Sequence, residues 1–126
     1  MNDRLFAVRG ATQVAFDDKQ TIEAAVIELF KAIIETNKLS YDAVVSVQFT
    51  ITPDLHTYNP ATALRNYEGT SALPLFCMQE PIVDNMLDRA IRVLIHYYAP
   101  ADHFQKHVYL HGAASLRPDL VDFPKK

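Results

Sequence analysis

The amino-acid sequence predicts an α+β fold in which helices cover one side of a mixed β-sheet. Four stretches are rich in β-branched and aromatic residues, as strands are, and one long stretch repeats apolar residues at helical spacing. The connections between them are short, which favours a sheet and helices packed directly on each other. At 126 residues and 49% hydrophobic content, the chain fits a single domain over residues 1–126.

The first strand is expected over residues 5–14, and it contains the segment Arg9-Gly10-Ala11-Thr12. Gly10 is free to adopt positive φ, so we expect the strand to meet a bend there, with Arg9 beside it. Arg9 is then either a solvated arginine at a sheet edge or a residue that faces a binding site.

A long helix should follow Asp17 and Asp18, because carboxylates accept the unpaired N–H groups of a helix N-terminus. Its apolar residues form one continuous stripe, which predicts a helix that packs on the core and ends with Asn37 as its C-cap. The stripe consists of Ile22, Ala25, Val26, Leu29, Phe30, Ile33 and Ile34.

A strand over residues 41–51 and a short helix over residues 61–67 are expected next. Asn59 and Pro60 suit the N-cap and first position of that helix, and Gly69 suits the position after its end. The helix carries Arg65, which is either solvated or part of a site.

The stretch 74–80 is predicted to be a buried strand that ends on a carboxylate at the rim of a pocket. Alternatively, Glu80 simply ends the strand in water, and Cys77 is a small core residue. Strand alternation places Leu75, Cys77 and Gln79 on one face and Phe76, Met78 and Glu80 on the other.

Residues 81–88 should form a connector with one or two helical turns, followed by a strand over 90–98. Arg92 lies in the middle of this apolar strand, where burial of its charge is costly unless it meets an anion. That anion is either a structural carboxylate or a ligand. A short strand over 107–110 and a mobile tail over 112–126 complete the prediction.

The composition excludes several classes of protein. The net charge is −3 and no basic block occurs, which argues against a nucleic-acid partner. No apolar run is long enough for a membrane span, and the N-terminus lacks the apolar core of a signal peptide, so we expect a cytoplasmic protein without membrane contact. The single cysteine, Cys77, cannot form an internal disulfide.

The motifs of metal, nucleotide and hydrolase sites are missing from the sequence. His103, His107 and His111 are spaced four apart but have no accompanying glutamate, so we expect neither a metal nor a cofactor. The charged and polar residues that remain as candidates can bind a small dianion and stabilise charge. These candidates are Arg9, Arg65, Arg92, Arg117, Glu80, Tyr109 and Cys77.

Strands that are apolar on both faces further predict a homo-oligomer, in which copies cover the bare side of the sheet.

Six motifs, in order and at matching spacings, resemble the monofunctional chorismate mutases of the Bacillus type over nearly the whole chain. They are Arg9-Gly10-Ala11-Thr12, Thr52-Pro53-Asp54-Leu55-His56, Cys77-Met78-Gln79-Glu80, Ile91-Arg92-Val93, His107-Val108-Tyr109-Leu110 and Leu116-Arg117-Pro118-Asp119-Leu120. The resemblance implies a homotrimeric pseudo-α/β-barrel with active sites between subunits, which rearranges chorismate to prephenate in the biosynthesis of phenylalanine and tyrosine.

The resemblance also implies roles for individual residues. Arg92 matches the arginine that meets the ether oxygen of the breaking bond, and Glu80 with Cys77 matches the groups that contact the ring hydroxyl. Arg9 and Tyr109 match the residues that hold the side-chain carboxylate. The implied catalytic residues are thus Arg92, Glu80 and Arg9. Arg65 and Arg117 match basic residues at the cleft mouth, and the implied lining also includes Asn59, Ala61, Leu75, Phe76 and Leu116.

The sequence departs from the family pattern at three of these places. Asn59 and Thr62 stand where the family often has an aromatic residue and a lysine, and Phe76 replaces a smaller polar residue. We expect the loss of the lysine at the cleft mouth to affect substrate capture more than chemistry. Two alternatives remain, a non-catalytic trimeric module that binds small carboxylates and a trimer similar to the small imine deaminases.

Overall fold

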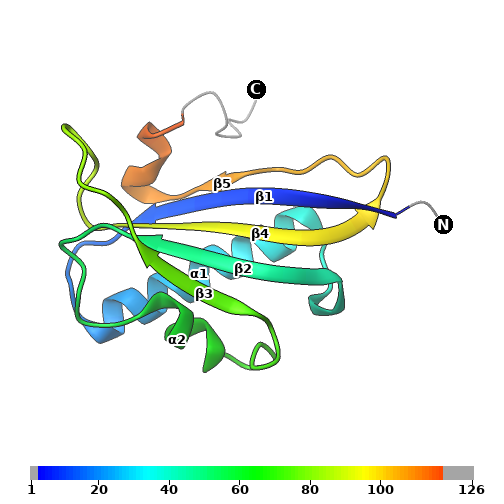
Figure 1. Ribbon diagram of the computed structural model, residues 1–126, viewed down its shortest axis with the longest axis horizontal. Helices are drawn as coiled ribbons and strands as arrows, with labels where there is room; N and C mark the ends of the chain where they lie inside the picture. The colour runs from blue at the N-terminus through cyan, green and yellow to red at the C-terminus, as the bar shows by residue number, and fades with distance from the viewer. Residues whose placement is uncertain (1–2, 118–126) are drawn as a thin grey trace.

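The computed structural model, which describes residues 3–117, contains a five-stranded mixed sheet (Figure 1). The strands are β1 (Asp3–Gln13), β2 (Val44–Ile51), β3 (Leu75–Gln79), β4 (Ala90–Pro100) and β5 (Val108–Tyr109), in the order β3-β2-β4-β1-β5. β4 runs antiparallel to both of its neighbours, and the edge strands β3 and β5 run parallel to β2 and β1. The helices are α1 (Lys19–Asn37) and α2 (Pro60–Arg65), with short 3-10 helices η1 (Tyr41–Ala43) and η2 (His111–Ser115). The α+β class expected from the sequence is confirmed.

The core lies between α1 and one face of the sheet, and Figure 1 shows α1 crossing behind the central strands. The predicted apolar stripe of α1 is the side that packs there, because residues three and four apart share one helix face. Ile22, Val26, Leu29, Phe30 and Ile33 are all buried, against alternate residues of β1, β2 and β4.

The two ends of α1 are held by different means. Asp18 is the N-cap and accepts the Thr21 N–H at 2.8 Å, as expected from the sequence. At the other end the prediction of Asn37 as C-cap is wrong, because Lys38 takes the left-handed conformation (φ 55°) and caps the helix. The buried Asn37 side chain instead bonds the backbone of Lys106, 69 residues further along the chain.

Gly10 does not bend the first strand, contrary to the sequence prediction. β1 continues without a break to Gln13, and Gly10 has no positive φ. A Cβ at Gly10 would lie 2.6 Å from Ile33 Cδ1 and 3.0 Å from the Val108 carbonyl oxygen. The glycine therefore allows α1 and β5 to approach β1 closely, which is a packing requirement rather than a conformational one.

Two predicted boundaries and one predicted helical turn are also wrong. Tyr41 begins η1 instead of a strand, and its ring packs on Phe30 at 5.6 Å. α2 ends at Arg65, and residues 66–70 form a loop that includes Gly69 at φ 85°. Between β3 and β4 the structure shows a turn and no helix, since Asn85 and Arg89 have positive φ values that a right-handed helix excludes.

The loop before α2 is anchored by Asp17, which sequence reasoning assigned to the start of α1. The Asp17 carboxylate accepts the backbone N–H groups of His56 and Thr57, each at 3.1 Å at its shortest, and the Thr57 hydroxyl at 2.8 Å. This clamp ties the N-terminal end of α1 to the segment that leads into α2. It therefore fixes where α2 lies along α1.

Among the residues described, no helix covers the second face of the sheet, which faces the viewer in Figure 1. Large apolar side chains are exposed on it, namely Leu5 of β1, Phe76 and Met78 of β3, and Tyr98 of β4. Within residues 3–117, neither helix combines the length and the apolar character that crossing a membrane requires.

Candidate active site

A cavity of about 310 Å³ opens on the uncovered face of the sheet. Its lining includes Arg9 from β1, Arg92 from β4, Tyr109 from β5 and Arg117, which follows η2. Three guanidinium groups and a phenol thus converge on one concave surface. Four arginines were predicted from the sequence as site residues. Arg9, Arg92 and Arg117 lie together in this cavity, whereas Arg65 is not among the residues that line it.

Strand register explains why residues far apart in sequence meet in this cavity. Ala11 on β1 lies opposite Arg92 on β4 and also beside Tyr109 on β5. Arg9 is two residues from Ala11, so its side chain projects from the same face of the sheet. On the other side of β4, Thr50 of β2 lies opposite Arg92.

Arg92 forms an ion pair with Glu80 at the edge of the cavity. Its Nε lies 3.0 Å from Glu80 Oε2, with the Arg92 side chain 44% exposed and that of Glu80 11% exposed. The expectation that Arg92 is buried in the sheet is wrong for the single chain, because the face that it occupies is uncovered. Only Nε is used in this contact, and a guanidinium carries further N–H donors on its two terminal nitrogens.

Thr50 is a site residue that sequence reasoning missed. Its hydroxyl donates to Glu80 Oε2 at 2.6 Å, so two groups from neighbouring strands hold one carboxylate oxygen. A signal for it exists in the sequence, because Ser46, Gln48 and Thr50 alternate with apolar residues along β2. That alternation indicates a strand with one polar face. The position of Thr50 opposite Arg92 depends on register, which the alternation does not give.

The remaining predicted site residues lie elsewhere on the chain. Leu75 and Cys77 project from the opposite face of β3 and pack against the core, where burial raises the pKa of the Cys77 thiol. Asn59 accepts the Ala61 N–H at 2.8 Å and caps α2.

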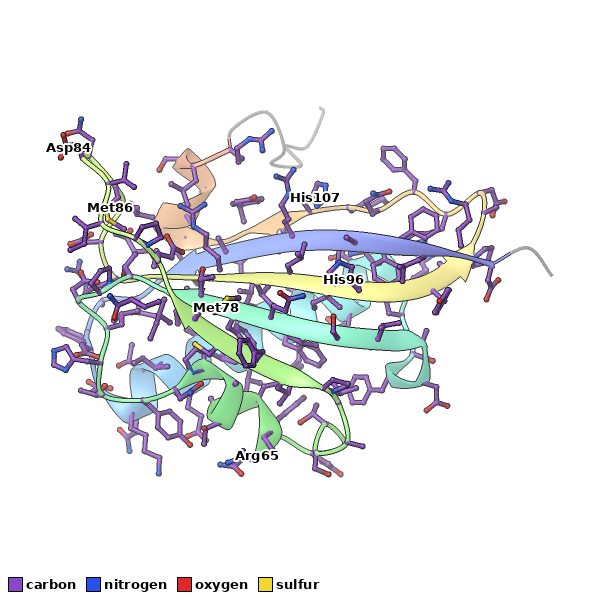
Figure 2. The ribbon with its side chains drawn as sticks, in the orientation of Figure 1. Arg65, Met78, Asp84, Met86, His96 and His107 are labelled. Atoms are coloured by element: carbon purple, nitrogen blue, oxygen red, sulfur yellow. The ribbon has the colours of Figure 1, made fainter. Side chains whose placement is uncertain are left out.

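Arg65 is exposed at the end of α2, and Figure 2 shows it on the opposite side of the view from His107, which directly precedes β5. Phe76 is exposed on the uncovered sheet face, and Leu116 is half-buried beyond η2. Residues Pro118, Asp119 and Leu120 of the last motif, and most of the expected mobile tail, lie outside the described residues. One chain therefore presents two groups of predicted site residues, one around the cavity and one on α2 and the core side of β3.

The three regularly spaced histidines have separate partners. His103 Nε2 lies 2.7 Å from the Tyr97 hydroxyl, the Nδ1 atom of His107 accepts the Arg9 backbone N–H, and His111 pairs with Glu28 at 3.0 Å. No group of three histidine, cysteine or acidic side chains with the geometry of a metal site occurs in the part of the chain that the structure describes.

A larger groove of about 910 Å³ runs between α1, the end of β1 and η2. It is lined by Arg89, His111 and Glu28 among others, and it contains none of the predicted site residues. Its one cation, Arg89, already donates to Asp88 and to the Val14 carbonyl oxygen. The smaller cavity is therefore the better candidate for a site that binds a small anion.

Known proteins show the same combination of sequence and fold. A family model described as chorismate mutase type I matches residues 5–120. The chain is 39% identical to chorismate mutase AroH of Bacillus subtilis, over 90% of each chain. It is 40% identical to chorismate mutase AroH of Thermus thermophilus, over 90% of this chain and 93% of the relative. A solved chorismate mutase from Clostridium thermocellum has 39% identity and a TM-score of 0.80, with 87% of this chain and 98% of that chain covered. The family expected from the sequence motifs is confirmed, and the chain belongs to the type I chorismate mutases.

Proposed function

We propose that this protein is an isomerase that converts chorismate to prephenate in the biosynthesis of phenylalanine and tyrosine, with no cofactor. The observation that carries the proposal is the pairing of Glu80, at 3.0 Å, with Arg92, one of three arginines that line the cavity. A fixed cation and a fixed carboxylate side by side suit a substrate that presents an ether oxygen, a hydroxyl and two carboxylates. Membership of the type I chorismate mutase family supports the same conclusion.

The chemistry of this reaction requires no general base. The rearrangement is unimolecular and pericyclic, and in its polarised transition state the ether oxygen gains negative charge as its bond to carbon breaks. An enzyme accelerates it by holding the compact conformer and by placing positive charge at that oxygen. Arginine stays protonated at any working pH and offers a planar set of donors, so it can serve as a constant cation.

We assign the roles as follows. Arg92 places its charge at the ether oxygen, and Glu80, oriented by Thr50, accepts a hydrogen bond from the ring hydroxyl. Arg9 and Tyr109 bind the side-chain carboxylate from the strands on the other side of β4. The 3.0 Å contact with Glu80 holds the Arg92 guanidinium in place before substrate arrives, which is the preorganisation that electrostatic catalysis depends on.

The assembly that we propose is a homotrimer in which each active site is shared by two copies. Two observations support it. The uncovered sheet face exposes Leu5, Phe76, Met78 and Tyr98, a pattern that favours coverage by another copy. In addition, the group of predicted site residues on α2, which includes Arg65, does not line the cavity of its own chain and is available to complete the cavity of a neighbour. We propose a cytoplasmic location for this trimer.

Two measurements test the proposal. Purified protein should convert chorismate to prephenate, followed by the loss of chorismate absorbance, and its mass by light scattering should be three times that of the chain. Binding of chorismate without turnover would favour a carboxylate-binding module instead. An active, stable monomer would rule out both the trimer and the shared site.

A further inference from the structure

The backbone of Arg9 is held by a side chain rather than by the sheet alone. The Arg9 N–H donates to Nδ1 of His107 at 3.0 Å, on the side of β1 where β5 pairs. β5 consists only of Val108 and Tyr109, so its ladder to β1 is very short. The His107 ring adds a further link between the two strands, directly beside the cavity that Arg9 and Tyr109 line.

The segment that carries His107 is fixed from both directions. On one side, the Asn37 side chain of α1 donates to the Lys106 carbonyl oxygen at 3.0 Å and accepts the Lys106 N–H at 2.8 Å. On the other side, the Leu110 N–H donates to the Ala11 carbonyl oxygen at 2.9 Å. Between these anchors, the hydrogen bond of His107 sets how closely the β5 segment lies against Arg9.

The contact with Arg9 determines the protonation state of His107. A nitrogen that accepts an N–H cannot carry a proton itself, so the ring is neutral with its proton on Nε2. Burial lowers the pKa of His107, and the guanidinium groups of Arg9 on β1 and of Arg117 beyond η2 lower it further. The bond is therefore intact above the ordinary histidine pKa of 6.5 and is lost as the pH falls below that value through the lowered pKa of the folded protein.

We propose that His107 is a positioning residue, whose neutral ring sets the spacing between Arg9 and Tyr109 and thereby the affinity for the substrate carboxylate. The inference rests on the proposed function, since the carboxylate is that of chorismate. Protonation turns the Nδ1 acceptor into a donor that faces the Arg9 N–H, which separates β5 from β1. Because the carboxylate is held equally in the ground state and the transition state, KM rises on acidification and kcat stays constant.

Two substitutions separate the hydrogen bond from the titration. In His107→Asn the amide oxygen can take the place of Nδ1 and accept the Arg9 N–H, but it does not titrate. We expect KM within about twofold of the parent above neutrality and no rise in KM on the acid side. In His107→Ala the acceptor is gone at every pH, so KM should stay about three- to tenfold above the neutral-pH value of the parent, the effect of losing one ordinary hydrogen bond, and should not rise further on the acid side. His111→Asn, on the other side of Tyr109, is the matched control and should keep the acid-side rise of the parent.

Further outcomes decide the inference independently of enzyme activity. NMR of the imidazole nitrogens should show the Nε2–H tautomer at neutral pH, and the Arg9 amide resonance should shift with the His107 titration. These spectra are expected whether or not the protein forms prephenate. A protein that shows them but forms no prephenate would overturn the proposed function alone. The positioning role is wrong if His107→Asn retains the acid-side rise in KM, or if the KM of His107→Ala matches that of the parent above neutrality. If His107→Ala does not fold, the asparagine variant decides the question.

Discussion

Replacement of Arg92 by citrulline tests the electrostatic mechanism directly. Citrulline is neutral but keeps the Nε–H, and Nε is the atom that lies 3.0 Å from Glu80 Oε2. The variant can therefore retain the contact that orients the side chain and lose only the positive charge. Removal of one preorganised group that stabilises transition-state charge lowers kcat by about 10²–10³, or about 2.7–4 kcal/mol. We expect at least this loss in kcat, with a smaller change in KM.

The controls for this experiment come from the same chain. Arg4 lies on β1 outside the cavity, with its guanidinium carbon 4.7 Å from the centre of the Phe6 ring, so Arg4→citrulline should leave kcat unchanged. Arg92→Ala also removes the contact with Glu80, whose side chain is only 11% exposed and would keep Thr50 as a partner. The assay is the initial rate of chorismate loss, with the mass by light scattering measured on each variant. A citrulline variant that assembles, binds chorismate and has a kcat within about threefold of the parent would show that the charge of Arg92 does not stabilise the transition state.

Three further predictions concern affinity, orientation and packing. Arg65→Ala should raise KM with a smaller effect on kcat, measured by steady-state kinetics, because a cation at the proposed cleft mouth would attract substrate and transition state alike. Thr50→Val should lower kcat/KM by about three- to tenfold, since Glu80 loses its 2.6 Å hydrogen bond; unchanged kinetics would mean that Arg92 alone orients Glu80. Gly10→Ala should lower the free energy of unfolding in urea by about 1–3 kcal/mol, because the added Cβ would lie 2.6 Å from Ile33 Cδ1; equal stability would show that the helix yields at no cost.

The parts of the fold that follow from local pattern were predictable from the sequence. The stripe of α1, with Val26, Leu29 and Ile33 among its members, is buried as its spacing indicates. The Asp18 N-cap and the Asn59 N-cap were likewise predictable, because each acts within three residues along the chain. Such features depend on interactions between neighbours in sequence, which a single sequence contains in full.

The predictions that were wrong concern residues whose partners are distant in sequence. Asn37 has the residue type of a C-cap, but its amide is used by Lys106, a partner that the helix sequence does not reveal. Gly10 is a residue type that often marks a bend, yet here it allows Ile33 and Val108 to approach β1 closely. In both cases tertiary packing decided between conformations that the local sequence allows equally.

The candidate site shows the same division. Arg9, Glu80 and Arg92 could be selected from residue type and motif, and the structure places all three at or beside one cavity. Their spatial relation follows from the register of β1, β2 and β4, and a register shift of one residue would turn each side chain to the other face. Thr50 was missed for that reason. The roles assigned to these residues stay predictions until variants are measured.

The division of predicted site residues between the two faces of one chain has a genetic consequence. In the proposed trimer with shared sites, a chain that lacks Arg92 and a chain that lacks Arg65 would each still carry the half of the site that the other has lost. In a ring of three copies, every mixed trimer contains one junction where an intact cavity meets an intact α2. Equal amounts of the two chains, unfolded together and reassembled, should therefore form about one site in four that carries both arginines. Two such alleles expressed in one cell would complement each other, although neither encodes a fully functional enzyme.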